Sequence, residues 1–103
     1  MLHILIPSYN RVDQALNTVK LLISGSPEAS SYQITIIDNA SPLPYSTHSS
    51  NDLFLIPYLE SGVLTIIRNN GNVGMGANIA KCFEYAANKA GWLWILSDDD
   101  HVH

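Results

Sequence analysis

Short apolar runs alternate along this chain with amphipathic segments, and each run stops at a group of polar turn residues. The runs are residues 2–6, 32–37, 63–67 and 92–96. Their length and their β-branched content predict buried strands. Apolar residues recur instead at helical spacing over residues 11–23 and 74–90, which predicts two helices. Strands that alternate with helices predict an α/β fold: a βαβ sandwich in which helices cover both faces of a parallel sheet.

Turn and cap residues predict where these elements end. Asn10 stands where it can cap the first helix, and glycine with proline at 25–27 ends it. Residues 42–50 are rich in Ser, Pro and Thr and predict a loop. Residues 51–60 predict one short helix that Pro57 interrupts.

The polar groups that follow the strands predict a binding site. They are Ser8 to Asn10, Asp38 with Asn39, residues 68–72, and Asp98 to Asp100. In parallel sheets the carboxyl ends of the strands meet at one edge, where helix N-termini and loop side chains converge on ligands. We therefore expect these four groups to share one site.

Three consecutive carboxylates, Asp98, Asp99 and Asp100, repel one another unless a cation relieves the repulsion. A divalent cation that prefers oxygen ligands, Mg²⁺ or Mn²⁺, suits them. Side-chain alternation along a strand would direct Asp98 and Asp100 to the same side. A solvated acidic turn is the alternative, and His101 with His103 leaves open a transition-metal site.

Composition and spacing exclude several classes of protein. Five Lys and Arg residues and a net charge of -4 argue against a nucleic-acid binder. No apolar run in the sequence approaches the roughly 18 residues of a membrane span. The single cysteine, Cys82, rules out an internal disulfide, fits a reducing compartment such as the cytoplasm, and suits a core position. The first turn holds no glycine, which excludes a dinucleotide fingerprint, and no Walker A motif is present.

Four motifs together resemble glycosyltransferase family 2. They are ILIPSYNR at 4–11, ITIIDNAS at 34–41, NNGNVG at 69–74 and WLWILSDDD at 92–100. The resemblance covers essentially the whole chain but only the N-terminal half of the family's catalytic domain. It implies the Rossmann-like GT-A fold of nucleotide-diphospho-sugar transferases, with residues 1–103 as a single, truncated domain.

The resemblance also implies a site. The turn of Pro7, Ser8, Tyr9 and Asn10 would line the nucleoside pocket, and Asp38 or Asn39 would hydrogen-bond the base. Asp98 to Asp100 resembles the DxD motif, so that Asp98 and Asp100 would bind the cation. The full set of expected nucleotide-sugar contacts is Pro7, Ser8, Tyr9, Asn10, Asp38, Asn39, Asn72, Gly74, Asp98 and Asp99. The family usually carries an aspartate where Asn39 stands, and an amide presents a donor as well as an acceptor.

By the same resemblance, the catalytic base and the acceptor pocket belong to a second half that follows His103. We therefore expect a part that binds a nucleotide-diphospho-sugar with a divalent cation and cannot transfer sugar alone. The alternative is a non-catalytic, oligomeric interaction module on the same fold. An open strand edge with apolar surface predicts a homodimer in either case.

Overall fold

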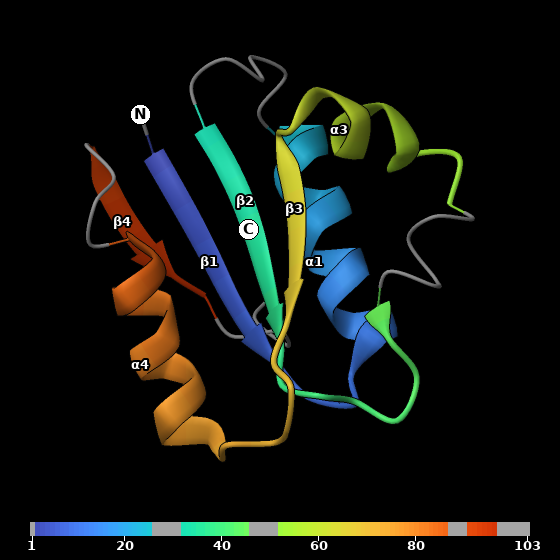
Figure 1. The fold of residues 1–103 in the computed structure, drawn as a ribbon. Helices are drawn as coiled ribbons and strands as arrows, with labels where there is room; N and C mark the ends of the chain where they lie inside the picture. Colours follow the sequence, from blue (N-terminus) through green and yellow to red (C-terminus); the bar gives the residue numbers. More distant parts are fainter. Residues whose placement is uncertain (1, 26–31, 46–51, 87–90, 97–103) are drawn as a thin grey trace.

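The computed structural model describes residues 2–25, 32–45, 52–86 and 91–96. Four strands and three helices are labelled within them (Figure 1). In chain order these are β1 (Leu2–Ser8), α1 (Val12–Gly25), β2 (Tyr32–Asp38), α3 (Ile56–Ser61), β3 (Leu64–Arg68), α4 (Met75–Ala86) and β4 (Trp92–Ile95).

The strands form one sheet in the order β3-β2-β1-β4, and every neighbouring pair is parallel. Helices α1 and α3 lie on one face of the sheet, and α4 lies on the other (Figure 1). The predicted α/β architecture with a parallel sheet covered on both faces is therefore confirmed.

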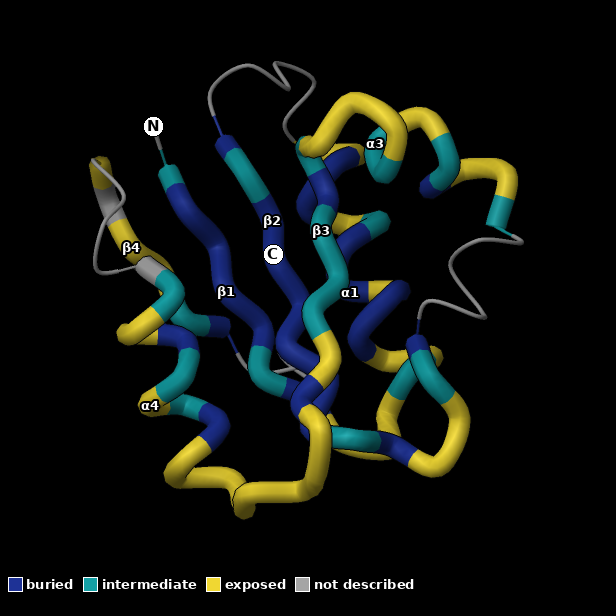
Figure 2. Tube along the Cα trace, viewed as in Figure 1, coloured by how far each residue is buried: buried dark blue, intermediate teal, exposed yellow. Residues whose placement is uncertain are grey.

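Alternation along the strands divides the core between the two faces. The larger cluster, on the α1 face, contains Ile4 and Ile6 of β1, Tyr32, Ile34 and Ile36 of β2, and Val19 and Leu22 of the helix. The smaller cluster, on the α4 face, contains Leu5, Ile37 and Cys82. β1 and β2 are buried along most of their length because each has a strand on both sides (Figure 2).

Cys82 is fully buried in that smaller cluster. Desolvation raises the pKa of its thiol to about 11, so the nucleophilic thiolate is scarce at neutral pH. The predicted role of Cys82 as a small core residue is confirmed.

Several predicted boundaries shift. β1 continues through Pro7 to Ser8, and β2 continues to Asp38, so the first residue of each of these two polar groups lies inside the sheet. Pro57 does not interrupt α3: it lies in the first turn, where an N–H would have no helical partner and a proline is tolerated.

Asn10 is not the N-cap of α1, contrary to the prediction. The carbonyl of Arg11 accepts the first helical hydrogen bond, from the Ala15 N–H at 2.9 Å, which makes Arg11 the N-cap residue. Asn10 precedes it with a left-handed φ of 53°, a conformation that asparagine tolerates better than most residues.

None of the helices in the described part of the chain is long and apolar enough to cross a membrane.

Candidate functional site

Three strands end level with one another at the carboxyl edge of the sheet. Ser8 pairs with Asp38, and Asp38 pairs with Arg68. Backbone bonds continue the alignment one residue further, from the Asn39 N–H to the Ser8 carbonyl at 2.9 Å and from the Asn69 N–H to the Asp38 carbonyl at 2.8 Å. The polar turns that follow β1, β2 and β3 therefore meet at one edge.

Asp38 has no exposed surface, and its carboxylate accepts from three protein donors. Oδ1 accepts the Ser41 N–H at 3.0 Å. Oδ2 accepts the Tyr45 N–H at 3.3 Å and Arg68 Nη1 at 2.9 Å. A buried carboxylate is tolerated because charge-assisted hydrogen bonds replace its hydration.

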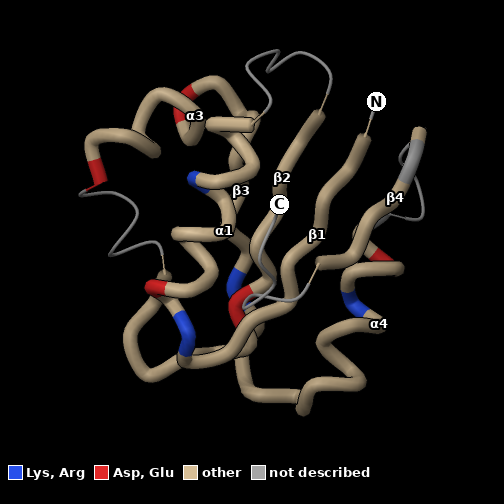
Figure 3. The backbone as a smooth tube through the Cα atoms, turned by 180° about the vertical axis from the view of Figure 1, so that it is seen from behind, with Lys and Arg blue, Asp and Glu red and all other residues tan. Residues whose placement is uncertain are grey.

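Arg68 completes this arrangement from the neighbouring strand. Its Nη2 donates to the Ser41 carbonyl at 2.8 Å, so the guanidinium joins the side chain of Asp38 to the turn after β2. The Arg68 side chain keeps 40% of its surface exposed. Asp38 and Arg68 thus form an ion pair at the ends of β2 and β3 (Figure 3).

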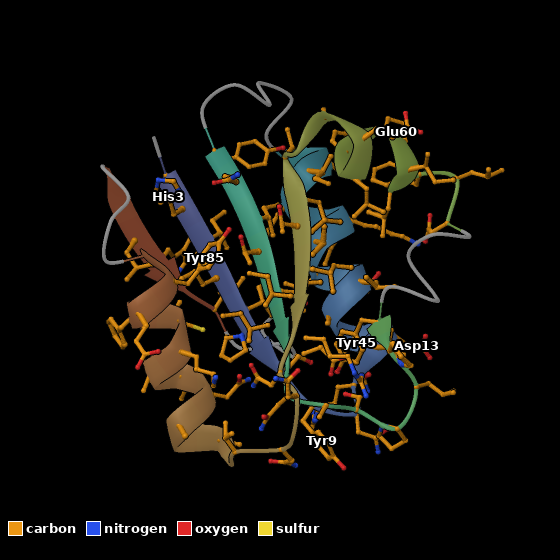
Figure 4. All side chains as sticks on the ribbon, in the orientation of Figure 1. His3, Tyr9, Asp13, Tyr45, Glu60 and Tyr85 are labelled. Carbon is orange, nitrogen blue, oxygen red and sulfur yellow. The ribbon has the colours of Figure 1, made fainter. Side chains whose placement is uncertain are left out.

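Tyr45 joins the turns that follow β1 and β2. Its hydroxyl lies 2.7 Å from Ser8 Oγ and accepts the Arg11 N–H at 2.8 Å. Ser41 Oγ accepts the Asn10 N–H at 2.8 Å, which supports the left-handed backbone there. Tyr45 is almost fully buried near the start of α1, and Tyr9 lies beyond the sheet edge (Figure 4). Sequence reasoning missed Tyr45 because its segment was predicted to be a loop.

Four asparagines, Asn39, Asn69, Asn72 and Asn78, form a second set of contacts, which we call the asparagine network. Asn39 Nδ2 donates to Asn72 Oδ1 at 2.9 Å and to the Gly74 carbonyl at 3.3 Å. Asn39 Oδ1 accepts Asn69 Nδ2 at 2.9 Å and the Val73 N–H at 3.0 Å.

The remaining contacts carry the asparagine network to helix α4. Asn69 Nδ2 also donates to Asn78 Oδ1 at 2.8 Å, and Asn78 Nδ2 donates to the Ile37 carbonyl at 3.2 Å. The Gly74 N–H donates to Asn72 Oδ1 at 2.8 Å. The N–H groups of Val73 and Gly74 are thus both used by side chains, which argues against a phosphate-binding loop at this turn.

The predicted site residues fall into two classes by exposure. Tyr9, Asn10, Asn72 and Gly74 are exposed, and Pro7 is half-buried. Ser8, Asp38 and Asn39 are buried, and their side chains face protein partners. A direct bond from Asp38 or Asn39 to a base stays a prediction, and it would require these partners to be exchanged.

The predicted cation ligands, Asp98 and Asp100, lie outside the described residues, as do Asp99, His101 and His103. Elsewhere in the chain, the described residues hold no group of three or more His, Cys, Asp or Glu side chains that suits a metal. β4 runs parallel to β1 up to Ile95, and the Leu96 N–H donates to the Leu5 carbonyl at 3.0 Å. The acidic residues follow this strand in the sequence.

A family comparison matches almost the entire chain. The family model described as "Glycosyl transferase family 2" matches residues 3–103. No curated protein sequence matches the chain.

Three solved structures illustrate the likeness in fold. The mannosyltransferase PcManGT from Pyrobaculum calidifontis, in complex with GDP-Man and Mn²⁺, has a TM-score of 0.72 at 12% identity. GalNAc-T7 with UDP, GalNAc and Mn²⁺ has a TM-score of 0.71 at 22% identity. S. aureus TarS 1–349 in complex with UDP-GlcNAc has a TM-score of 0.62 at 17% identity.

These three matches cover 95%, 95% and 97% of this chain but only 27%, 18% and 27% of the respective solved chains. The likeness confirms the GT-A architecture that the motifs predicted. The chain thus corresponds to less than a third of the length of each of these three structures.

Proposed function

Because the chain belongs to glycosyltransferase family 2, we propose that residues 1–103 form a nucleotide-sugar-binding domain of a metal-dependent glycosyltransferase. The family match over residues 3–103 carries this proposal. The sheet edge supports it, since the turns after three strands meet there and present exposed Tyr9, Asn10 and Asn72.

In the proposed site, Pro7, Ser8, Tyr9 and Asn10 line the nucleoside pocket. Tyr9 is 43% exposed and offers an aromatic face on which a base can stack. Asp38 and Asn39 lie beneath this surface, and Asn72 with Gly74 forms the opposite wall. Asp98 and Asp99 complete the donor contacts.

A divalent cation, Mg²⁺ or Mn²⁺, would be held by Asp98 and Asp100, and when bound it stabilises the negative charge of a departing nucleoside diphosphate. A pair of carboxylates suits such a hard cation. The two solved structures named above with Mn²⁺ support this assignment by their fold.

Sugar transfer, in this proposal, needs residues outside positions 1–103. A transferase also needs a base that takes the proton of the acceptor hydroxyl, and we place that base and the acceptor pocket in a further part of the domain. Residues 1–103 would bind the donor without transferring it.

Calorimetric titration of the chain with UDP-, GDP- and dTDP-sugars, with and without Mn²⁺, tests the proposal. We expect one of the three to bind in a Mn²⁺-dependent manner, and we expect the double variant D98N/D100N to lose that dependence. The variant D52N is a matched control, because Asp52 is a carboxylate of the far loop before α3. Absence of binding across the panel would overturn the proposal.

We also propose a homodimer formed through β4. Within the described residues, β4 pairs with β1 alone, and Leu93 and Trp94 leave 38% and 42% of their surface exposed. Phe83 of α4 adds a further exposed apolar side chain. An open strand edge with apolar side chains on both faces favours association.

Sedimentation velocity tests the dimer. The variant Trp94→Lys should shift the chain toward monomer, whereas Leu21→Lys, on α1 and similarly exposed, should not. A wild-type chain that is monomeric at every concentration would refute the dimer. A tight dimer that binds no nucleotide would instead favour the interaction module.

We further propose a cytoplasmic location. The thiol of Cys82, the single cysteine of the sequence, is free and buried, which fits a reducing compartment.

A further inference from the structure

The amide of Asn39 is saturated by the protein itself. An asparagine side chain has two N–H donors and an oxygen that accepts two bonds. The two donors reach Asn72 Oδ1 and the Gly74 carbonyl, and the oxygen accepts from Asn69 and from the Val73 N–H. Only 3% of the residue is exposed. A nucleotide base would find no free hydrogen-bonding position on this side chain.

We propose that Asn39 is a positioning residue, which fixes the 69–74 turn against the end of β2 and makes no contact with the nucleotide base. This inference rests on the proposed function, because the turn carries Asn72 and Gly74 of the proposed donor site. Selection between bases then depends on other groups, foremost on the exposed turn at Tyr9 and Asn10.

The amide at position 39 and the amide at position 72 are complementary, because the first donates the hydrogen bond that the second accepts. An aspartate at 39 would keep both acceptor contacts, with Asn69 and with Val73, but would lose both donors. Its second oxygen would then face Asn72 Oδ1 and the Gly74 carbonyl, at the present separations of 2.9 and 3.3 Å. Two acceptors at such a distance repel each other.

Rotation of the Asn72 amide does not remove this conflict. Turned over, Asn72 would offer a donor to the new carboxylate, but its oxygen also accepts the Gly74 N–H at 2.8 Å. The rotation would therefore place an amide donor against a backbone donor. An aspartate at 39 needs either a different residue at 72 or a proton of its own.

Protonation of an aspartate at position 39 would make the stability of that variant depend on pH. The side chains bonded to Asn39, those of Asn69 and Asn72, do not titrate, and neither does Asn78 behind them. The charged groups beside it are Asp38, which precedes it in the sequence, and Arg68, and these two are paired with each other. A carboxyl at 39 would be buried, with one of its oxygens against two acceptors, and both the burial and these acceptors raise its folded-state pKa. Its protonated form stabilises the fold at low pH, and this contribution is lost as pH rises through the folded pKa.

The test compares Asn39→Asp with Asn70→Asp, which adds the same charge to an exposed position of the same turn. Urea unfolding is measured for both variants and wild type at pH 5 and pH 7.5, without nucleotide. We expect the midpoint of N39D to fall well below wild type at pH 7.5 and to recover toward it at pH 5. The midpoint of N70D should follow wild type at both pH values.

A double-mutant cycle with Asn72→Ala supplies the second measurement. Removing the Asn72 oxygen removes one of the two repulsive contacts, so N39D should lower the midpoint less in the N72A background than in wild type. Two results would refute the proposed dependence of Asn39 on Asn72: additive effects of the two substitutions on the midpoint, or a lowering of the N39D midpoint that is the same at both pH values.

Nucleotide titrations separate positioning from direct base contact. If Asn39 only positions the turn, N39D weakens UDP- and GDP-sugar binding by the same factor at pH 7.5, so the ratio of the two affinities stays unchanged. A change of about tenfold in that ratio, the size expected from one altered base contact, would refute the proposal. If wild type binds no nucleotide, the proposed function fails, while the unfolding measurements still decide whether Asn39 and Asn72 are matched.

Discussion

The turns at the carboxyl edge of the sheet are held by two kinds of chemistry. On the α1 side, one buried carboxylate, Asp38, gathers Arg68 and two backbone N–H groups. On the α4 side, the asparagine network uses only neutral amides that bond to one another and to the backbone. The first arrangement depends on one carboxylate, whereas the second is shared among four side chains.

This difference implies different responses to substitution and to pH. Removal of Asp38 leaves several hydrogen-bond donors without their acceptor at once. Removal of one asparagine leaves part of the asparagine network bonded. The neutral network does not itself titrate in the physiological range, so its strength is independent of pH unless a charge is introduced. Substitutions on the two sides should therefore differ in the size of their effects.

Asp38→Ala should give the largest loss of stability. The buried N–H groups of Ser41 and Tyr45 would lose their acceptor and Arg68 its partner, which should lower the free energy of unfolding by about 3 kcal/mol. Urea unfolding measures the loss. The variant D52N is the control, since the Lys20–Asp52 pair is partly exposed and such pairs contribute at most about 1 kcal/mol. Equal losses of unfolding free energy in both variants would show that the Asp38 hydrogen bonds stabilise the fold no more than an exposed ion pair does.

Asn69→Ala should cost less, about 2 kcal/mol. Its amide donates to Asn39 and Asn78. Asn39 Oδ1 would keep the Val73 N–H as a donor, so one of the two acceptors remains bonded. Urea unfolding is again the measurement, and Asn70→Ala on the same turn is the matched control. A loss larger than that of Asp38→Ala would reverse the comparison between the two sides.

Tyr45→Phe should cost about 1 kcal/mol, because the ring stays in place and only the hydroxyl is removed. The Arg11 N–H and Ser8 Oγ lose the oxygen that joins them. We expect weaker nucleotide binding as well, since the turn from Ser8 to Arg11 is less firmly positioned. Tyr58→Phe, half-buried on α3, is the control and should leave nucleotide binding unchanged.

The smallest effect concerns Asp52, whose pKa is lowered chiefly by its hydrogen bond with Lys20. A folded-state pKa below the ordinary value of 3.8 means that stabilisation is present above that value and is lost as pH falls through the folded pKa. D52N should therefore be slightly less stable than wild type at pH 7, and the difference should vanish once the pH is well below the folded pKa. A constant difference from neutral to strongly acidic pH, measured by urea unfolding, would contradict the assignment.

The sequence predicts the fold well because its signals are local and repeated. Strand runs such as 32–37 and the helix after Gly74 follow from apolar spacing alone. The parallel direction of the strands follows from the alternation of strands and helices. Boundaries were less accurate, since Ser8 and Asp38 carry polar side chains yet pair within the sheet. A polar residue can continue a strand when the next turn supplies its hydrogen bonds.

The meeting of the turns after β1, β2 and β3 at one sheet edge was predictable, whereas the contacts within them were not. Asp38 and Asn39 lie at the expected edge, but their burial depends on partners 30 residues away, Arg68 and Asn69. Nothing in the local sequence indicates such partners. Tyr45 was missed for the same reason, because its value to the site depends on Ser8, 37 residues earlier.

The position of β4 in the sheet has a consequence for biosynthesis. Leu2 pairs with Trp92, so β1 leaves the ribosome long before the strand that hydrogen-bonds one of its two edges. Contacts between such distant residues slow folding, and an apolar strand with one open edge is prone to wrong association meanwhile. One edge of β1 therefore stays without its partner strand until residues 92–95 have been synthesised.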